Sequence, residues 1–146
     1  MLAYVFWHRP GEDVARTDYE ARLRAFHSKL DAPSASFRLH ALPWKPVDGY
    51  EDWYLVEDWA ALGMLNEAAL APVRRRRHDA AAHASWQGWG AVYRLLRGAP
   101  QPPAGVRWAP ADAPEVPAAW QRQMVLGPAP EYCLVSDAAH GRERVS

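Results

Sequence analysis

The amino-acid sequence predicts a single α+β domain in which the elements follow the order strand, helix, strand, strand, helix, strand, with an extension after the last strand. Three observations lead to this fold class. Four short segments are apolar throughout or alternate between apolar and polar residues, which is typical of strands. Two longer segments between them carry helical patterns. Eight of the 13 prolines lie between Pro100 and Pro130. The predicted domain covers residues 1–98, and the proline-rich C-terminal extension covers residues 99–146.

Length and composition are those of an ordinary globular protein. The 146 residues are 49% hydrophobic and 23% charged, so a core can form without disulfides or metals. Seventeen basic and 17 acidic residues give a formal net charge of zero. This argues against nucleic acid as a partner, because affinity for nucleic acid depends largely on excess positive charge. Cys133 is the single cysteine, so an intrachain disulfide and a multi-cysteine metal site are excluded.

The N-terminal apolar stretch Leu2–Trp7 does not resemble a membrane segment. It is too short to cross a bilayer, and it lacks both the basic leader and the cleavage pattern of a signal peptide. We therefore expect a cytoplasmic protein without a membrane partner.

The first predicted elements are a central strand and an amphipathic helix. Leu2–His8 is apolar on both of its faces, which indicates a strand that is covered on both sides. Thr17 and Glu20 have the spacing of a capping box at the start of a helix. The apolar stripe of that helix consists of Tyr19, Leu23, Phe26 and Leu30.

The next elements complete the predicted order. Ser36–Leu42 alternates as a strand, and Trp53–Glu57 is a second one. Asp58 can cap the following helix, and Pro72 divides that helical region into Ala60–Leu70 and Val73–Trp86. Gly88 and Gly90 end the helix, and Ala91–Leu96 is the fourth strand. The order is that of the ferredoxin-like βαββαβ fold, an antiparallel sheet with its helices on one face.

The extension is too apolar for a solvated linker. It contains Trp108, Trp120 and a short predicted strand, Tyr132–Val135, so we expect it to pack on the domain or on a partner subunit. Tryptophan is unusually frequent in the whole chain, with eight residues. Filling of the core and of a dimer interface is the simpler explanation, and lining of a ligand pocket is the alternative.

A homodimer is expected because helices on one face of a four-stranded sheet leave the other face uncovered. Both faces of the strands carry bulky apolar groups: Tyr4 and Phe6 against Val5 and Trp7, and Tyr54 and Val56 against Trp53 and Leu55. An exposed patch of this kind usually marks an interface. Two such sheets packed face to face would cover it and enclose a cavity.

The element order, with the stretches Trp53–Trp59 and Gly90–Leu96, resembles the dimeric α+β barrel proteins. These include EthD-like proteins, antibiotic-biosynthesis-type monooxygenases, muconolactone isomerases and NIPSNAP proteins. The resemblance implies a homodimer that binds a small organic molecule in a cavity between sheet and helices. It also implies cofactor-independent oxygenase or isomerase chemistry on an aromatic or polyketide-like compound. A non-catalytic binding or scaffold module is the alternative, and a haem-binding or haem-degrading protein with His83 as axial ligand is a further one.

Candidate site residues lie on one face of the predicted strands. His8 shares a face with Tyr4 and Phe6, and there it could act as a general base or donate a hydrogen bond to a ligand. A strand-end histidine bonded to backbone or water is the simpler alternative. The further candidates for ligand binding are Arg38, His40 and Tyr54. For Arg38 and His40, a solvent-facing edge is the alternative.

Asp79 and His83 are the last candidates, because a spacing of four residues places both on one face of a helix. The carboxylate could then orient the imidazole for acid–base chemistry. An ordinary surface pair is the alternative. The sequence contains no glycine-rich phosphate loop and no motif for a nucleophile or a metal, so we predict neither a metal nor a cofactor.

Overall fold

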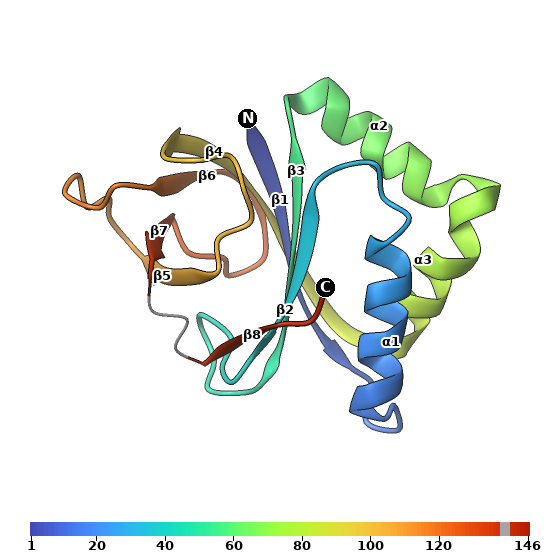
Figure 1. Cartoon of the computed structure of the whole chain (residues 1–146). Helices are drawn as coiled ribbons and strands as arrows, with labels where there is room; N and C mark the ends of the chain where they lie inside the picture. Colours follow the sequence, from blue (N-terminus) through green and yellow to red (C-terminus); the bar gives the residue numbers. More distant parts are fainter. Residues whose placement is uncertain (138–140) are drawn as a thin grey trace.

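The described strands form one antiparallel sheet that curls into a nearly closed barrel, with three helices on one of its sides (Figure 1). The computed structural model describes residues 1–137 and 141–146, except for the side chains at 69, 70, 73, 74 and 77. The strand order is β5-β7-β6-β4-β1-β3-β2-β8. The elements are β1 (Leu2–Pro10), α1 (Arg16–His27), β2 (Ser34–Leu39), β3 (Gly49–Val56), α2 (Trp59–Leu70), α3 (Pro72–Ala84), β4 (Ser85–Arg97), β5 (Gly105–Ala109), β6 (Ala119–Leu126), β7 (Tyr132–Ser136) and β8 (Arg142–Arg144).

The predicted fold class is wrong. A ferredoxin-like βαββαβ domain over residues 1–98 would end its sheet at β4 and β2. In the structure β6 pairs with β4 and β8 pairs with β2, so that the extension continues the sheet at both of these edges. The physical reason is that an edge strand presents unpaired N–H and C=O groups, which the strands of the extension satisfy. The predicted α+β barrel made by two subunits is likewise replaced by a barrel made from the strands of one chain.

Two local predictions failed and one was confirmed. β3 begins at Gly49, four residues before the predicted start, and therefore includes Glu51 and Asp52. The predicted capping box is absent, since α1 begins at Arg16 after an N-cap without a side-chain hydrogen bond. The predicted cap of α2 is confirmed, because Asp58 Oδ1 accepts a hydrogen bond of 2.9 Å from the Ala61 N–H.

Gly88 and Gly90 are part of β4 and do not mark a break between helix and strand. They pair with His8 and Phe6 of β1, respectively. A methyl group at Gly88 would overlap the Phe6 ring, and one at Gly90 would lie 2.7 Å from Tyr4 Oη. The two glycines are therefore required because aromatic rings of β1 lie over the backbone of β4.

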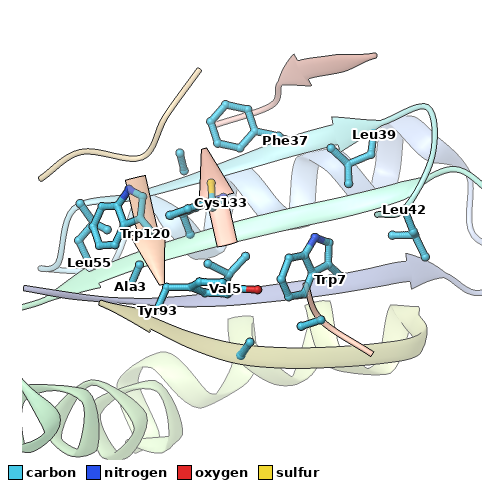
Figure 2. Packing of buried hydrophobic residues seen from close by; sticks show 14 residues of the cluster. Ala3, Val5, Trp7, Phe37, Leu39, Leu42, Leu55, Tyr93, Trp120 and Cys133 are labelled. Atoms are coloured by element: carbon cyan, nitrogen blue, oxygen red, sulfur yellow. The ribbon is translucent and has the colours of Figure 1, made fainter. Parts of the chain in front are cut away.

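The side of the sheet opposite the helices is packed from within the chain. Its core combines β1 and β3 with β6 and β7, and it buries Trp7, Trp120 and Cys133 (Figure 2). Trp53 of β3 belongs to the same cluster. This is the face that we assigned to a partner subunit. Because the extension covers it, a second subunit is not needed there. The homodimer itself stays a prediction, which a native mass measurement would test.

A buried ion pair between Glu51 and Arg142 helps to join the two ends of the strand order. Glu51 accepts hydrogen bonds from the indole N–H groups of Trp7 (2.8 Å) and Trp53 (2.6 Å), and from Arg142 (2.5 Å). Arg142 also donates to the carbonyl oxygen of Pro103, just before β5. Its guanidinium group lies 3.5 Å from the centre of the Phe37 ring. Arg142 thereby connects β8, at one end of the strand order, to the chain beside β5 at the other end.

Replacing Arg142 by Met is expected to lower the free energy of unfolding by about 3–5 kcal/mol, because the Glu51 carboxylate would stay buried without its cation. Chemical denaturation measures this. The matched control is Arg144→Met, at an exposed residue of the same strand, and it should change stability by less than about 0.5 kcal/mol. Equal losses in both variants would show that the Glu51–Arg142 pair does not hold the barrel together.

Candidate functional site

A cavity of about 630 Å³ lies between the helices and the sheet, on the side away from the barrel core. Its volume falls within the range of roughly 300–1,000 Å³ that is usual for small-molecule sites. Strands β1, β3, β4 and β6 contribute to the wall, and so do all three helices. The lining is mainly apolar, and it consists of Tyr4, Phe6, His8, Leu23, Phe26, Leu30, Asp52, Tyr54, Trp59, Leu62, Gly63, Leu65, Asn66, His78, Ala81, Ala82, Ser85, Val92, Met124 and Leu126.

Aromatic rings form one side of the cavity. Tyr4 stacks with Phe6 and with Tyr54, with ring centroids 6.2 and 5.9 Å apart and interplanar angles of 25° and 24°. Phe6 continues the row onto His8, at 5.4 Å and 21°. The row follows from the strand pairing, because Tyr4 lies opposite Tyr54 and alternate residues of β1 share one face. The result is a wall of nearly parallel rings.

A buried group of polar side chains interrupts this apolar wall. Oδ2 of Asp52 lies 3.1 Å from Nε2 of His8 and 3.3 Å from Nε2 of His27, and it accepts a hydrogen bond of 2.9 Å from the Tyr54 hydroxyl. All four residues are buried. Asp52 and His8 line the cavity, whereas His27 lies behind them at the end of α1. The Nε2 atoms are not aligned for hydrogen bonds with the carboxylate, so the two contacts are electrostatic.

Burial and charge act in opposite directions on Asp52. Burial raises the pKa of the carboxyl group, because it penalises the charged form. The imidazoles of His8 and His27 outweigh this effect and hold the pKa of Asp52 well below its ordinary range. Burial, with Asp52 as the second cause, raises the pKa of the Tyr54 hydroxyl well above its usual value. At neutral pH the structure therefore holds an ionised carboxylate beside a neutral phenol.

A chain of hydrogen bonds leads from His8 to the surface of α3. Nδ1 of His8 is 2.5 Å from the Tyr19 hydroxyl, which is 2.7 Å from Oγ of Ser85. Ser85 donates its own proton to the carbonyl oxygen of Ala81 at 3.0 Å. Because a hydroxyl has one proton, Tyr19 must donate to Ser85, and it must then accept from His8.

The same count of protons assigns the state of His8. Nδ1 carries a proton because it donates to Tyr19. On the other side of the ring, the Asp52 carboxylate lies 3.1 Å from Nε2. The imidazole of His8 and the carboxylate of Asp52 therefore form a buried pair. On its other side, the ring of His27 is held by Ser34, whose Oγ lies 2.9 Å from Nδ1.

The structure brings together four of the predicted site residues. Tyr4, Phe6, His8 and Tyr54 all line the cavity. The simpler alternative for His8, a strand-end histidine bonded to backbone or water, does not describe its environment, because its partners are Tyr19 and Asp52.

The other predicted residues lie elsewhere. Arg38 forms ion pairs with Glu143 and with Glu20, at the edge where β2 meets β8. His40 is 67% exposed at its side chain and lies 3.5 Å from Glu143. Neither residue lines the cavity. These positions match the alternative of a polar, solvent-facing edge.

Asp79 and His83 do not form the predicted pair among the described contacts. Asp79 contacts His78 at 3.2 Å and Arg75 at 3.6 Å. His83 is exposed and does not line the cavity. The imidazole that α3 contributes to the cavity wall is that of His78.

Sequence reasoning missed Asp52, His27, Tyr19 and Ser85 as site residues. The signal for Asp52 was present, since two acidic residues directly precede an apolar strand, but the strand was predicted to begin after them. Tyr19 was assigned to the core stripe of its helix. The contacts of His27 and Ser85 join residues of different elements, and the order of residues along the chain does not reveal them.

Among the described residues, no group of three histidine, cysteine, aspartate or glutamate side chains is arranged to hold a metal ion. Within the same part of the chain, no helix is both long and apolar enough to cross a membrane.

Asp52→Asn should lower the free energy of unfolding at pH 7, and this free energy should then depend less on pH in the acidic range. The pKa of Asp52 in the folded protein lies below the value of about 3.9 expected in the unfolded chain. Its contribution is therefore fully present above about pH 4 and is lost as the pH falls further, because the unfolded chain then binds a proton that the folded protein does not. We expect a loss of about 2–4 kcal/mol at pH 7.

Denaturation curves between pH 7 and pH 2 test this expectation, with Asp48→Asn as control because that carboxylate is 58% exposed. The difference in the free energy of unfolding between Asp52→Asn and the original chain should shrink as the pH falls. The corresponding difference for Asp48→Asn should stay constant. A constant loss for Asp52→Asn would contradict the low pKa of this group.

Comparison with known proteins finds no family model, no curated protein and no solved structure that matches this chain. The resemblance to the dimeric α+β barrel group stays a prediction.

Proposed function

We propose that this protein binds a small, mainly apolar organic molecule in the cavity, with the His8–Asp52 pair facing the polar part of that molecule. The observation that carries the proposal is a buried pair of a histidine and a carboxylate on the wall of a mainly apolar cavity. Apolar surface supplies affinity for the body of a ligand, and a few placed polar groups set its orientation.

Stability alone does not explain the pair. Buried ion pairs contribute little net stability, since apolar side chains of similar volume often stabilise a protein as well or better. Most of the other residues on the cavity wall are aromatic or aliphatic, so an apolar pair in place of His8 and Asp52 would suit the wall. A carboxyl group with a strongly shifted pKa inside a cavity is a recognised indication of a functional site.

Proton-transfer catalysis is the second candidate function. The observation in its favour is the chain His8–Tyr19–Ser85, which fixes the His8 ring through its Nδ1 and leaves Nε2 on the side of Asp52. A protonated His8 would donate to the carbonyl oxygen of the ligand, and a water molecule would take the proton from its α-carbon, since the lowered pKa of Asp52 makes that carboxylate a weak base. Isomerisation needs only proton transfers, so these groups suit an isomerase better than an oxygenase, which must also activate oxygen.

A non-catalytic binding module is the outcome if ligands bind without turnover. The haem alternative finds no support in the geometry, because the proposed axial residue His83 is exposed on α3 and lies outside the cavity. The histidine that does lie on the cavity wall beside Asp52 is already engaged with Tyr19 and Asp52.

Gly63→Leu should abolish binding of an apolar probe without unfolding the protein. Gly63 lies in α2 on the cavity wall, and a methyl group there would meet no atom within 4 Å. Leucine can therefore extend into the cavity, and it also favours the helix over glycine by about 0.5–1 kcal/mol. The measurement is the fluorescence of N-phenyl-1-naphthylamine on titration with protein, together with a thermal unfolding curve.

Met64→Phe is the matched control for this variant, because Met64 is the next residue of α2 but is 64% exposed and does not line the cavity. We expect at least a tenfold weaker affinity in Gly63→Leu and an unchanged one in Met64→Phe. Equal affinity in both would show that the probe binds elsewhere.

Catalysis predicts hydrogen exchange on a simple enolisable ketone. In D₂O the protein should accelerate exchange at the α-carbon of 2-tetralone above the rate in buffer, as followed by proton NMR. His8→Gln and Tyr19→Phe should each reduce that rate at least tenfold, whereas the exposed His83→Gln should leave it unchanged. No acceleration by the original chain, in a sample that binds the naphthylamine probe, would leave ligand binding as the function.

A further inference from the structure

We infer that the ligand of this cavity is an uncharged molecule with a hydroxyl group, and that its O–H donates a hydrogen bond to Oδ1 of Asp52. The inference rests on the proposed binding function and names the chemistry that the site selects. It follows from the two oxygens of one carboxylate, which have different surroundings.

The acceptor capacity of Asp52 is used on one oxygen only. Oδ2 faces His8, His27 and the Tyr54 hydroxyl. Oδ1 has no hydrogen-bond partner within the described part of the chain, and it is buried. A buried acceptor without a donor costs free energy. Because Asp52 lines the cavity, a ligand donor that displaces the side chains over Oδ1 would remove that cost.

The charges at the site select an uncharged donor. The imidazoles of His8 and His27 already lie beside the negative charge of Asp52, so an ammonium group would have to compete with them inside an apolar cavity. An anionic group would face the carboxylate and would carry no proton for Oδ1. A hydroxyl group avoids both costs, because it supplies one proton without a net charge.

The surroundings of Asp52 suit a flat molecule with the hydroxyl at one end. Phe6 lies opposite Asp52 in the strand pairing, and the Tyr4 ring makes interplanar angles of 25° with Phe6 and 24° with Tyr54. A flat, rigid apolar body can stack on this wall while its hydroxyl reaches Oδ1. A bicyclic compound is a suitable probe, since the cavity of about 630 Å³ exceeds its size.

The test compares three ligands that share one ring system: 2-naphthol, 2-methoxynaphthalene and 2-naphthoate. Their affinities are measured at pH 7 by displacement of N-phenyl-1-naphthylamine from the full chain. We expect 2-naphthol to bind at least tenfold more tightly than the methoxy compound, because a hydrogen bond to a charged acceptor is worth this much. We expect 2-naphthoate to bind most weakly of the three.

Asp52→Asn identifies the acceptor. The amide oxygen can accept from Tyr54 in place of Oδ2, which puts the NH₂ group at the position of Oδ1 and turns the acceptor into a donor. The preference for 2-naphthol over 2-methoxynaphthalene should then disappear, and it should persist in Asp48→Asn. The comparison among ligands on the original chain stands even if Asp52→Asn does not fold.

Each outcome bears on a distinct statement. Equal affinities of 2-naphthol and 2-methoxynaphthalene, or tightest binding of 2-naphthoate, would overturn the inference while leaving a ligand-binding cavity. Persistence of the hydroxyl preference in a folded Asp52→Asn would overturn the role of Oδ1. Failure of the naphthylamine probe to bind at all would overturn the proposed function and, with it, the inference.

Discussion

The pairing of β1 with β3 in a single register is the constraint on which the rest of the structure depends. In this register Trp7 lies opposite Glu51 and Phe6 lies opposite Asp52. Glu51 and Asp52 are adjacent in β3, so their side chains lie on opposite faces of the sheet, and both are buried. A slip by one residue would exchange the faces and leave each carboxylate without its partners. The register therefore specifies the barrel core and the cavity together.

The two carboxylates differ in how completely they are satisfied. Both oxygens of Glu51 accept hydrogen bonds, from Trp7, Trp53 and Arg142, and this network closes the barrel. Asp52 has partners on Oδ2 only, and its other oxygen is buried beside an apolar cavity. A fully paired group makes the interior rigid and unique, whereas a half-paired group beside an open space suits a ligand. We therefore assign structure to one face and binding to the other.

The extension makes this division possible. By covering the barrel side of the sheet with β6 and β7, it supplies within one chain the packing that we had expected from a partner subunit. It also adds Met124 and Leu126 to the wall of the cavity on the other side. The chain thus has one face that is filled and one that keeps a cavity of about 630 Å³. Gly88 and Gly90 leave room for the rings of Tyr4 and Phe6 on the cavity wall, because side chains at these two positions would displace the rings.

The sequence by itself determined the local elements and one face of the site. Alternation in Leu2–His8 placed Tyr4, Phe6 and His8 together, and the break at Pro72 separated α2 from α3, because these features depend only on near neighbours along the chain. Only the tertiary structure decided that β6 and β8 extend the sheet, and that His8 contacts Asp52 and Tyr19, which in turn contact His27 and Ser85. Their contacts join residues far apart in sequence, and edge pairing is satisfied by any strand of suitable length. The periodicity of the sequence does not indicate which strand pairs with an edge of the sheet. The fold class and half of the site residues could therefore not be predicted from it.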